Sequence, residues 1–349
     1  MSIRKLNPVK KKILKFFTAS FHNTKKTEGL AALSQKSSIK VLITRPNHRL
    51  GNQLLLTPLI QEISMLYPTA NIHLMLNGTL SSILFAQYPQ VKKVYNLPKK
   101  PFKNIFNYLG TLFSLKKTRY DIAITGCETS NSSKLFVKLA RARFKIYDSG
   151  TQTLHKPLHI AKYPIYNLKT FLQPNEDLST YAYPPLSLQL SAAELRQGQQ
   201  VLRDLVETAK PVISIFTFAT GRKCHDRLWW DEFYTKLQQR FQDYCIVEVL
   251  PMENVSQLDF KAVHYYSRDL REIAAVIANT AVFIGADSGM MHLAASTTTP
   301  VLGLFNVTQQ EVYGPYGGAN EAIDTNTVSI EDLIDKTQQA IAYTHAQAQ

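Results

Sequence analysis

The apolar residues of this 349-residue chain form short runs that alternate with segments of helical periodicity. The run Ile39–Thr44 is followed by Gln53–Tyr67, in which apolar residues recur every three or four positions. The same alternation continues to Tyr147 and starts again at Val212. Because parallel strands are joined by crossover connections that are usually helices, this pattern predicts two parallel sheets wrapped by helices.

In the first half, the pattern predicts strands at Ile39–Thr44, Ile72–Leu76, Lys93–Leu97, Tyr120–Thr125 and Phe144–Tyr147. The helices predicted there are Gln53–Tyr67, Leu80–Tyr88, Phe102–Lys117 and Ser132–Arg141. In the second half, the predicted strands are Val212–Phe216, Cys245–Leu250, Ala281–Ile284 and Val301–Leu304. The predicted helices there are Ala192–Glu207, Trp230–Phe241, Leu270–Asn279 and Ile330–Ala342.

These halves divide the chain into three predicted parts. Residues 1–38 form a basic amphipathic extension, residues 39–185 an N-terminal Rossmann-like lobe, and residues 186–349 a C-terminal Rossmann-like lobe. The length fits two domains of ordinary size. The proline-rich stretch 149–190 interrupts the α/β rhythm, and a helix at Tyr163–Leu172 is expected to cross between the lobes.

Composition indicates a cytoplasmic globular protein. The hydrophobic content of 45% is ordinary, and no run of about 18 apolar residues predicts a membrane-spanning helix. The N-terminus has no apolar segment of signal-peptide length. The three cysteines are far apart and lack metal-ligand spacing, which favours a reducing compartment and no metal site.

Charge is distributed unevenly along the chain. Residues 1–145 carry 25 Lys and Arg against 4 Asp and Glu, whereas residues 146–349 carry 15 against 22. A basic half of this kind predicts an anionic partner, either a phosphorylated lipid, an anionic membrane surface or nucleic acid. Nucleic acid is disfavoured, because the basic residues lack interleaved aromatic residues and recognition motifs.

Within the extension, Pro8–Phe21 has apolar residues near one helical face and lysines elsewhere. A basic amphipathic helix of this kind is typical of a membrane-surface anchor. A solvated tail and a nucleic-acid arm are the alternatives.

Residues 281–317 contain the most informative motif. A strand is followed by the turn Ala286–Gly289, a helix from Met290 to Ser296 and a second buried strand. A glycine-bearing turn between a strand and a helix is suited to anions, because free N–H groups and the helix dipole face the end of the sheet. Open α/β sheets hold nucleotide phosphates there.

Three ordered segments, Asp287–Ala295, Thr299–Phe305 and Gly314–Gly317, resemble the signature of glycosyltransferase family 9, which contains the heptosyltransferases of lipopolysaccharide core synthesis. The resemblance implies the GT-B fold, two facing Rossmann-like lobes with an interlobe cleft. It implies an inverting, metal-independent transferase without a cofactor. The donor would be a nucleotide diphosphate sugar, with ADP-heptose as one candidate. The acceptor would be a phosphorylated lipid-linked saccharide of the lipopolysaccharide core or a related type, reached from the cytoplasmic face of the inner membrane.

The residues expected to bind the donor are Thr220, Lys223, Glu253, Asp287, Ser288, Gly289, Met290 and His292. Thr220 and Lys223 match family positions that hold the diphosphate, where a lysine offsets charge on the leaving group. Glu253 follows the second strand of its lobe, a place suited to ribose hydroxyls. Asp287 has an alternative reading as a helix N-cap, and His292 as a packing residue.

The loop after the first strand, Arg45–Asn52, is expected to open into the cleft. Arg45, Arg49 and Gly51 are predicted to bind the acceptor, the arginines through its phosphate groups. The family pattern has an Asp, its proposed general base, at the position of Asn52. A neutral amide cannot act as a general base. We therefore expect Asn52 to orient the acceptor hydroxyl.

Three explanations of the missing carboxylate stay open. His48 lies in the same loop, and a free imidazole titrates at about pH 6.5, which suits a base. Glu128, after the strand Tyr120–Thr125, is a second candidate. The third is that catalysis rests on positioning or is lost. In that case the protein would be a catalytically silent, membrane-associated protein that binds a sugar nucleotide or a lipid-linked saccharide.

Overall fold

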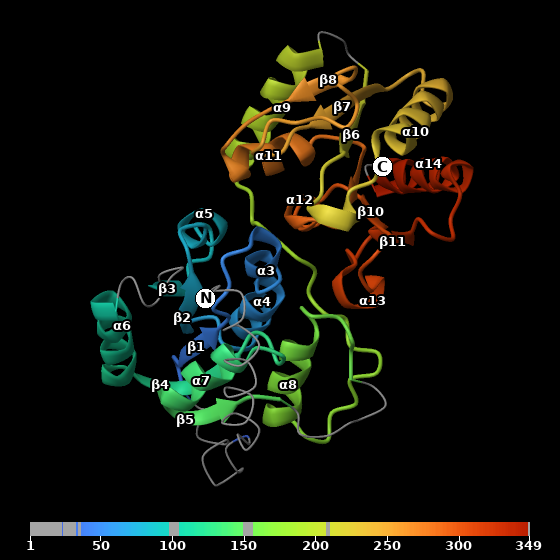
Figure 1. Ribbon diagram of the computed structural model, residues 1–349. Helices are drawn as coiled ribbons and strands as arrows, with labels where there is room; N and C mark the ends of the chain where they lie inside the picture. Colours follow the sequence, from blue (N-terminus) through green and yellow to red (C-terminus); the bar gives the residue numbers. More distant parts are fainter. Residues whose placement is uncertain are drawn as a thin grey trace, which may run out of the picture. The chain divides into compact units, whose positions relative to one another are not determined.

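The computed structural model describes residues 23, 33, 36–97, 105–148, 156–206 and 210–347 (Figure 1). Their backbone contacts divide the chain into two compact units. The first unit comprises the described residues of Met1–His48 and Leu56–Pro184, and the second comprises Arg49–Leu55 and Pro185–Gln349. Each unit is built around one parallel sheet, as the hydrophobic pattern predicts.

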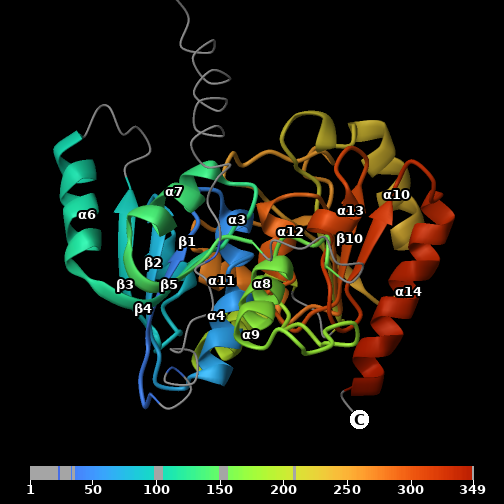
Figure 2. The same ribbon diagram turned by 90° about the horizontal axis from the view of Figure 1, so that it is seen from below.

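The sheet of the first unit has the order β3-β2-β1-β4-β5, and every described pair is parallel. Its strands are β1 (Lys40–Thr44), β2 (Asn71–Asn77), β3 (Val91–Leu97), β4 (Arg119–Thr125) and β5 (Arg141–Ile146). Its helices are α4 (Thr57–Leu66), α5 (Ser81–Leu84), α6 (Ile105–Lys117), α7 (Asn131–Leu139) and α8 (Tyr163–Leu172). Helices α6 and α7 cover one face of the sheet and α4 and α8 the other (Figure 2).

The sheet of the second unit has the order β11-β10-β9-β6-β7-β8 and is also parallel. Its strands are β6 (Val212–Phe216), β7 (Cys245–Val249), β8 (Val263–Tyr265), β9 (Val282–Ala286), β10 (Val301–Phe305) and β11 (Glu321–Asp324). Its helical elements are α3 (Leu50–Leu54), α9 (Ala192–Val206), η3 (Gly221–Lys223), α10 (Arg227–Arg240), α11 (Leu270–Ile277), α12 (Gly289–Ala294), α13 (Gln310–Tyr313) and α14 (Ile330–Gln347). Helices α10 and α14 share one apolar core with the sheet.

Several predicted elements differ in extent from those of the structure, and two strands were not predicted. The helix expected at Gln53–Tyr67 is two helices, because Pro58 begins α4 afresh and lacks the N–H that a continuous helix needs. The helix expected at Met290–Ser296 begins one residue earlier and ends at Ala294. Strands β8 and β11 were not predicted, because neither is a continuous apolar run.

Residues 49–55 are grouped differently by sequence and by structure. The sequence-based division placed them in the N-terminal lobe. By backbone contacts they belong to the second unit, because α3 packs against α12.

The predicted amphipathic segment Pro8–Phe21 lies outside the described residues. Described residues of the extension contact the rest of the first unit, among them Asn23, Lys36 and Ser38. The side chain of Asn23 accepts a hydrogen bond from the N–H of Tyr147 (2.7 Å) and donates one to the carbonyl of Asp148. Leu33 is fully buried.

Helices α9 and α11 approach most closely at Gly198. A Cβ added there would lie 2.3 Å from the carbonyl carbon of Ala275 and 2.4 Å from its oxygen. Backbone atoms cannot move aside as the end of a flexible side chain can, so only glycine fits.

We therefore expect Gly198→Ala to lower the free energy of unfolding by about 1–3 kcal/mol or more, the usual cost of overpacking. Urea denaturation measures this. Gly110→Ala is the control, because a Cβ at Gly110 in α6 meets nothing within 4 Å. It should stabilise by about 0.5–1 kcal/mol through helix propensity. Equal effects of the two substitutions would contradict the packing argument.

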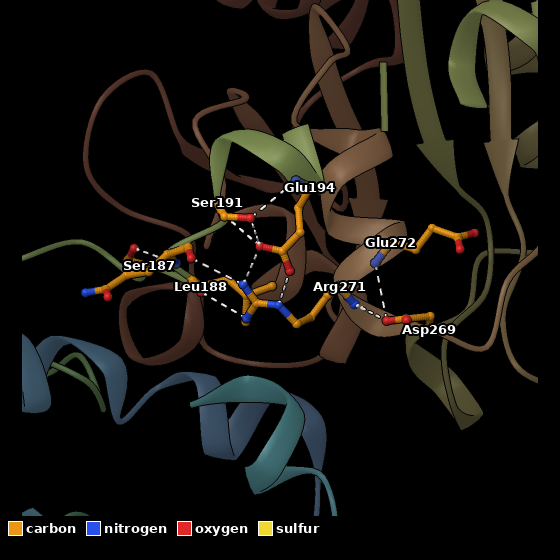
Figure 3. A network of polar contacts seen from close by, with 8 residues as sticks. Ser187, Leu188, Ser191, Glu194, Asp269, Arg271 and Glu272 are labelled. Atoms are coloured by element: carbon orange, nitrogen blue, oxygen red, sulfur yellow. Dashed lines mark hydrogen bonds and ion pairs between the residues drawn. The ribbon is translucent and has the colours of Figure 1, made fainter. Parts of the chain in front are cut away.

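The segment that leads into the second unit is anchored by Arg271 of α11. Figure 3 shows its guanidinium between the carboxylate of Glu194 and the backbone near Leu188. The guanidinium donates to Glu194 Oε2 (3.0 Å) and to the carbonyls of Leu188 and Gln189 (3.2 Å each). Glu194 also accepts from the N–H and the hydroxyl of Ser191 (2.7 Å each), a capping box at the start of α9.

Because of this network, we expect the free energy of unfolding to decrease as the solution becomes acidic. The hydrogen bond from Arg271 is the main cause that lowers the pKa of Glu194 from 4.5 to about 2. Stability from a depressed carboxyl pKa is present above the unfolded pKa and is lost as pH falls from about 4.5 towards 2. Between pH 6 and 3.5 we expect the wild type to lose about 1 kcal/mol more than Glu194→Gln, after discounting for solvent screening. Urea melts at both pH values measure this, and parallel losses would contradict it.

Candidate active site

The order of the strands locates a ligand-binding edge in the second unit. From β6 the chain continues to β7 and β8 on one side, whereas β9, β10 and β11 lie on the other side. Ligands of open α/β sheets bind outside the carboxyl ends of the strands where the order reverses, here between β6 and β9. The loop Thr217–Asp226 follows β6, and Asp287 and Ser288 follow β9.

Lys223, Asp287 and Thr308 form a polar cluster at this edge. The ammonium group of Lys223, in η3, makes an ion pair with Asp287 Oδ2, and the hydroxyl of Thr308 donates to the same oxygen. The side chain of Asp287 is 7% exposed, whereas that of Lys223 is 32% exposed. A buried carboxylate therefore holds a partly accessible cation where an anion would bind.

Sequence reasoning singled out Lys223 and Asp287 and missed Thr308. A usable signal existed, because Thr308 lies three residues beyond β10, which is the neighbour of β9. Loops after neighbouring parallel strands meet at one edge of the sheet.

The helix after β9 is capped by Ser288, not by Asp287. The hydroxyl of Ser288 accepts a hydrogen bond from the N–H of Met291 (3.3 Å), and its backbone is extended. Because Asp287 points to Lys223 and Thr308, its alternative reading as the N-cap is wrong. Gly289 and Met290 form the first turn of α12.

Two glycines let α3 and α12 approach closely. A Cβ on Gly51 would lie 2.5 Å from Cδ2 of His292, and a Cβ on Gly289 would lie 3.1 Å from Cβ of Leu50. His292 is 5% exposed and packs against Gly51, in agreement with its reading as a packing residue. The contact brings the Gly51–Asn52 segment next to the helix that follows Asp287.

Contacts from two neighbouring loops and from α10 fix the segment that carries Lys223. The side chain of Asn306 donates to the carbonyl of Arg222 (3.1 Å). His225 stacks on Trp229 with ring centroids 4.2 Å apart and lies 3.3 Å from the hydroxyl of Thr325. Burial lowers the pKa of His225 and so favours its neutral form.

Glu248, in β7, is a buried carboxylate that sequence reasoning missed. Its two oxygens accept hydrogen bonds from the hydroxyls of Thr217 (2.5 Å) and Ser256 (2.6 Å). Burial raises the pKa of Glu248, although both hydroxyls oppose the shift. The residue joins the loop after β6 to the loop after β7. An apolar strand pattern gives no reason to expect a carboxylate at its buried position.

Two predicted donor residues lie at the surface. Thr220 is exposed at the start of η3, and Glu253 is exposed in the turn Pro251–Asn254. None of the contacts described for residues 210–347 joins either side chain to the Lys223–Asp287 pair.

In the first unit, Arg45 is buried, whereas the sequence predicted an accessible cation that binds the acceptor. It is 1% exposed, and its Nη1 donates to the carbonyl of Gly126 (2.7 Å), so it holds together the loops after β1 and β4. His48 is exposed in the same loop. Arg49 is also exposed and belongs to the second unit by contacts.

The candidate carboxylate, Glu128, makes an ion pair with Lys156 (2.6 Å). Its N–H donates to the hydroxyl of Tyr163 (3.0 Å), which in turn contacts the thiol of Cys127. Glu128 follows β4, at the point where the strand order of the first sheet reverses next to β1.

No helix among the described residues is long and apolar enough to cross a bilayer. No group of three His, Cys, Asp or Glu residues in these parts of the chain is placed to hold a metal ion.

Comparison with known proteins shows which family the sequence resembles. A sequence model of glycosyltransferase family 9 (heptosyltransferase) matches residues 112–339. Lipopolysaccharide heptosyltransferase 3 of Escherichia coli K12 is 24% identical over 298 residues, covering 76% of this chain and 82% of its own length. Lipooligosaccharide heptosyltransferase 2 of Haemophilus influenzae is 23% identical over 309 residues, covering 79% and 86%.

Solved structures share the fold. A family 9 glycosyltransferase from Veillonella parvula superposes with a TM-score of 0.67 at 16% identity, covering 87% of this chain and 97% of its own. ADP-heptose lps heptosyltransferase II of E. coli gives 0.64 at 16% identity, covering 87% and 99%. The fold is therefore GT-B, as the sequence signature predicts. Because the family model spans most of the chain and includes the Lys223, Asp287 and Thr308 positions, the protein belongs to glycosyltransferase family 9 and is a heptosyltransferase-like glycosyltransferase.

Proposed function

We propose that this protein transfers a sugar, with inversion and without a metal ion, from a nucleotide diphosphate donor to a saccharide of the lipopolysaccharide core or a related lipid-linked acceptor. The observation that carries the proposal is the Lys223–Asp287–Thr308 cluster at the reversal point of the second sheet. Its support is the family match and the names of the relatives, which are lipopolysaccharide and lipooligosaccharide heptosyltransferases.

For the donor, we infer a diphosphate held beside Lys223. Its ammonium group offsets the negative charge that grows on the leaving group, and Asp287 and Thr308 keep it in place. The N–H groups of Ser288, Gly289 and Met290 face the same anion. Glu253 takes the ribose hydroxyls, and Thr220 contacts the diphosphate. One related structure is an E. coli heptosyltransferase with ADP, so ADP-heptose is the first donor to test.

For the acceptor, we infer that Arg49 binds a phosphate of the saccharide. Gly51 contributes through its packing on His292, where a side chain would not fit. Arg45 acts indirectly by fixing the loop, since it is buried against Gly126. Asn52 orients the attacking hydroxyl. The acceptor lies in the cytoplasmic leaflet of the inner membrane, so the protein works at that surface.

The reaction balances as one displacement. The acceptor oxygen forms a bond to the anomeric carbon, the bond from that carbon to the diphosphate oxygen breaks, and configuration inverts. The acceptor proton passes to His48, and the nucleoside diphosphate leaves with its charge beside Lys223. We prefer His48 to Glu128 as the base because the carboxylate of Glu128 already forms an ion pair with Lys156.

Release of nucleoside diphosphate tests the proposal. The purified protein is given ADP-heptose and a panel of UDP- and GDP-sugars, with and without core-lipid acceptor, in buffer containing EDTA. Release that needs both one donor and the acceptor is the expected result. Tight donor binding without release would favour the silent binding protein that Asn52 suggests. Release that stops in EDTA and returns with a divalent cation would overturn the metal-independent mechanism.

A further inference from the structure

The amino-terminal edge of the first sheet gathers positive charge. Strands β1, β3, β4 and β5 begin there, and helices α6 and α7 end there, because a crossover helix runs back to the start of the next strand. We call this surface the cationic edge. Its members are Lys36, Lys40, Lys92, Lys116, Lys117, Arg119, Lys138 and Arg141. It lies across the sheet from Arg45 and Glu128, which follow the carboxyl ends of β1 and β4.

Little negative charge balances the cationic edge. Residues 36–148 contain four acidic residues. Glu62 is buried in α4. Glu128 and Asp148 follow the carboxyl ends of β4 and β5, away from the cationic edge. Asp121 alone lies at this edge, where it pairs with Lys36 and accepts from the N–H of Lys40 (2.8 Å).

Two arginines show the imbalance most clearly. Arg119 and Arg141 are register partners in the neighbouring parallel strands β4 and β5, and both are exposed. Like charges placed side by side on a sheet repel each other and cost stability. In the second unit, by contrast, surface lysines such as Lys236 and Lys261 pair with carboxylates. The repulsion at the cationic edge would be relieved by an anionic partner.

An apolar side chain accompanies the charge. Phe113 in α6 is 72% exposed, and Lys116 and Lys117 follow it by three and four residues, so all three share one side of the helix. Next to them, the start of the sheet is hollowed between Lys36, Lys40 and Arg119. Exposed aromatic residues among basic ones are the pattern of proteins that lie on anionic bilayers.

Protection of an edge strand is the competing explanation. Charged residues along an exposed strand prevent pairing with another sheet, and β5 is an edge strand. That explanation accounts for Arg141 and for Lys92, which lies in the other edge strand, β3. The remaining cations lie before or at the start of inner strands and on two helices, where no sheet edge is open.

We propose that the cationic edge docks on an anionic bilayer, with its lysines and arginines on lipid phosphates and Phe113 in the head-group layer. This rests on the proposed function, because a lipid-linked acceptor lies in such a bilayer. Residues 1–35 of the sequence carry a further eight Lys and Arg and one Glu.

Vesicle co-sedimentation of the full chain tests this surface. One set of vesicles is phosphatidylcholine alone, and the other is a phosphatidylcholine–phosphatidylglycerol mixture. We expect binding to the anionic set only. Arg119→Glu together with Arg141→Glu should weaken it at least about 25-fold, since each basic residue near an anionic bilayer contributes roughly fivefold. Thermal melts should stay close to those of the wild type, because one exposed like-charge pair replaces another.

The matched control reverses two exposed arginines of α9, Arg196 and Arg203, with the same change in net charge. Full vesicle binding is expected for the control. An equal loss in both variants would show that net charge alone attracts the protein and would overturn the proposal. Tighter binding to a duplex oligonucleotide than to anionic vesicles, lost in the Arg119 and Arg141 variant, would identify a nucleic-acid surface instead.

Transfer activity separates this inference from the proposed function. With a soluble acceptor saccharide that lacks the lipid, the Arg119 and Arg141 variant should keep wild-type turnover. With acceptor embedded in anionic vesicles, it should lose most of its rate. Turnover on the soluble acceptor without any vesicle binding would overturn the cationic edge and leave the transferase intact. Vesicle binding without turnover on either acceptor would support the cationic edge and overturn the proposed transfer activity.

Discussion

Replacing Lys223 by methionine is expected to lower turnover by about 10²–10³-fold, the usual cost of removing one group that stabilises charge in a transition state. The lysine is the cation held by Asp287 and Thr308 at the reversal point of the second sheet. Methionine has nearly the same length and no charge. Nucleoside diphosphate release under saturating donor and acceptor measures the effect. Lys223→Arg keeps the charge and should retain more activity than methionine.

The control is Lys236→Met, because Lys236 also pairs with carboxylates but lies on the outer surface of α10. That variant should turn over like the wild type. Methionine at 223 leaves the buried Asp287 without its cation, so thermal melts must show that the fold survives at the assay temperature. A folded variant with turnover within threefold of wild type would remove Lys223 from the mechanism.

His48→Ala is expected to lower turnover at least about 10²-fold with little change in donor affinity, since general-base catalysis contributes about 10²–10⁴-fold. The expectation rests on Asn52, which cannot accept a proton, and on Glu128, which is neutralised by Lys156. His48 is exposed in the loop after β1. Turnover is followed by diphosphate release, and donor affinity by calorimetry.

His264→Ala supplies the control, because His264 is also exposed but lies in β8, away from the reversal point of its sheet. Full activity in His48→Ala would exclude His48 as the base. Asn52→Asp then asks whether the family's carboxylate works in this loop. Recovery of the activity lost in His48→Ala by adding Asn52→Asp would show that the two positions serve the same proton transfer.

The sequence predicted the central strands of both sheets well, because they are buried on both faces and therefore read as apolar runs. β6 and α8 have the predicted bounds, and β1, β7 and β10 differ from theirs by one residue at an end. Such runs depend on burial alone, which local sequence reports. Strands β8 and β11 were not predicted, because they carry polar residues at the two edges of the second sheet and do not form apolar runs.

The sequence pattern could not predict contacts between loops that are far apart in the chain. The burial of Arg45 against Gly126 depends on β1 and β4 being neighbours, which follows from strand order. The helix cap could not be assigned either, because Asp287 and Ser288 are both good capping residues. In the structure, Lys223 and Thr308 bind the Asp287 carboxylate, and the hydroxyl of Ser288 caps α12.

By itself, the sequence determined the α/β architecture, the family signature at Asp287–Ala295 and the lysine that follows β6. Each of these is a local pattern, set by burial and by short-range turn chemistry. Only the tertiary structure decided that Thr308 joins Lys223 and Asp287, and that Gly51 packs on His292. It also gathered the cationic edge from four strands and two helices. Those groupings depend on the order in which strands assemble, and the energy that selects this order comes from contacts between residues far apart in the chain.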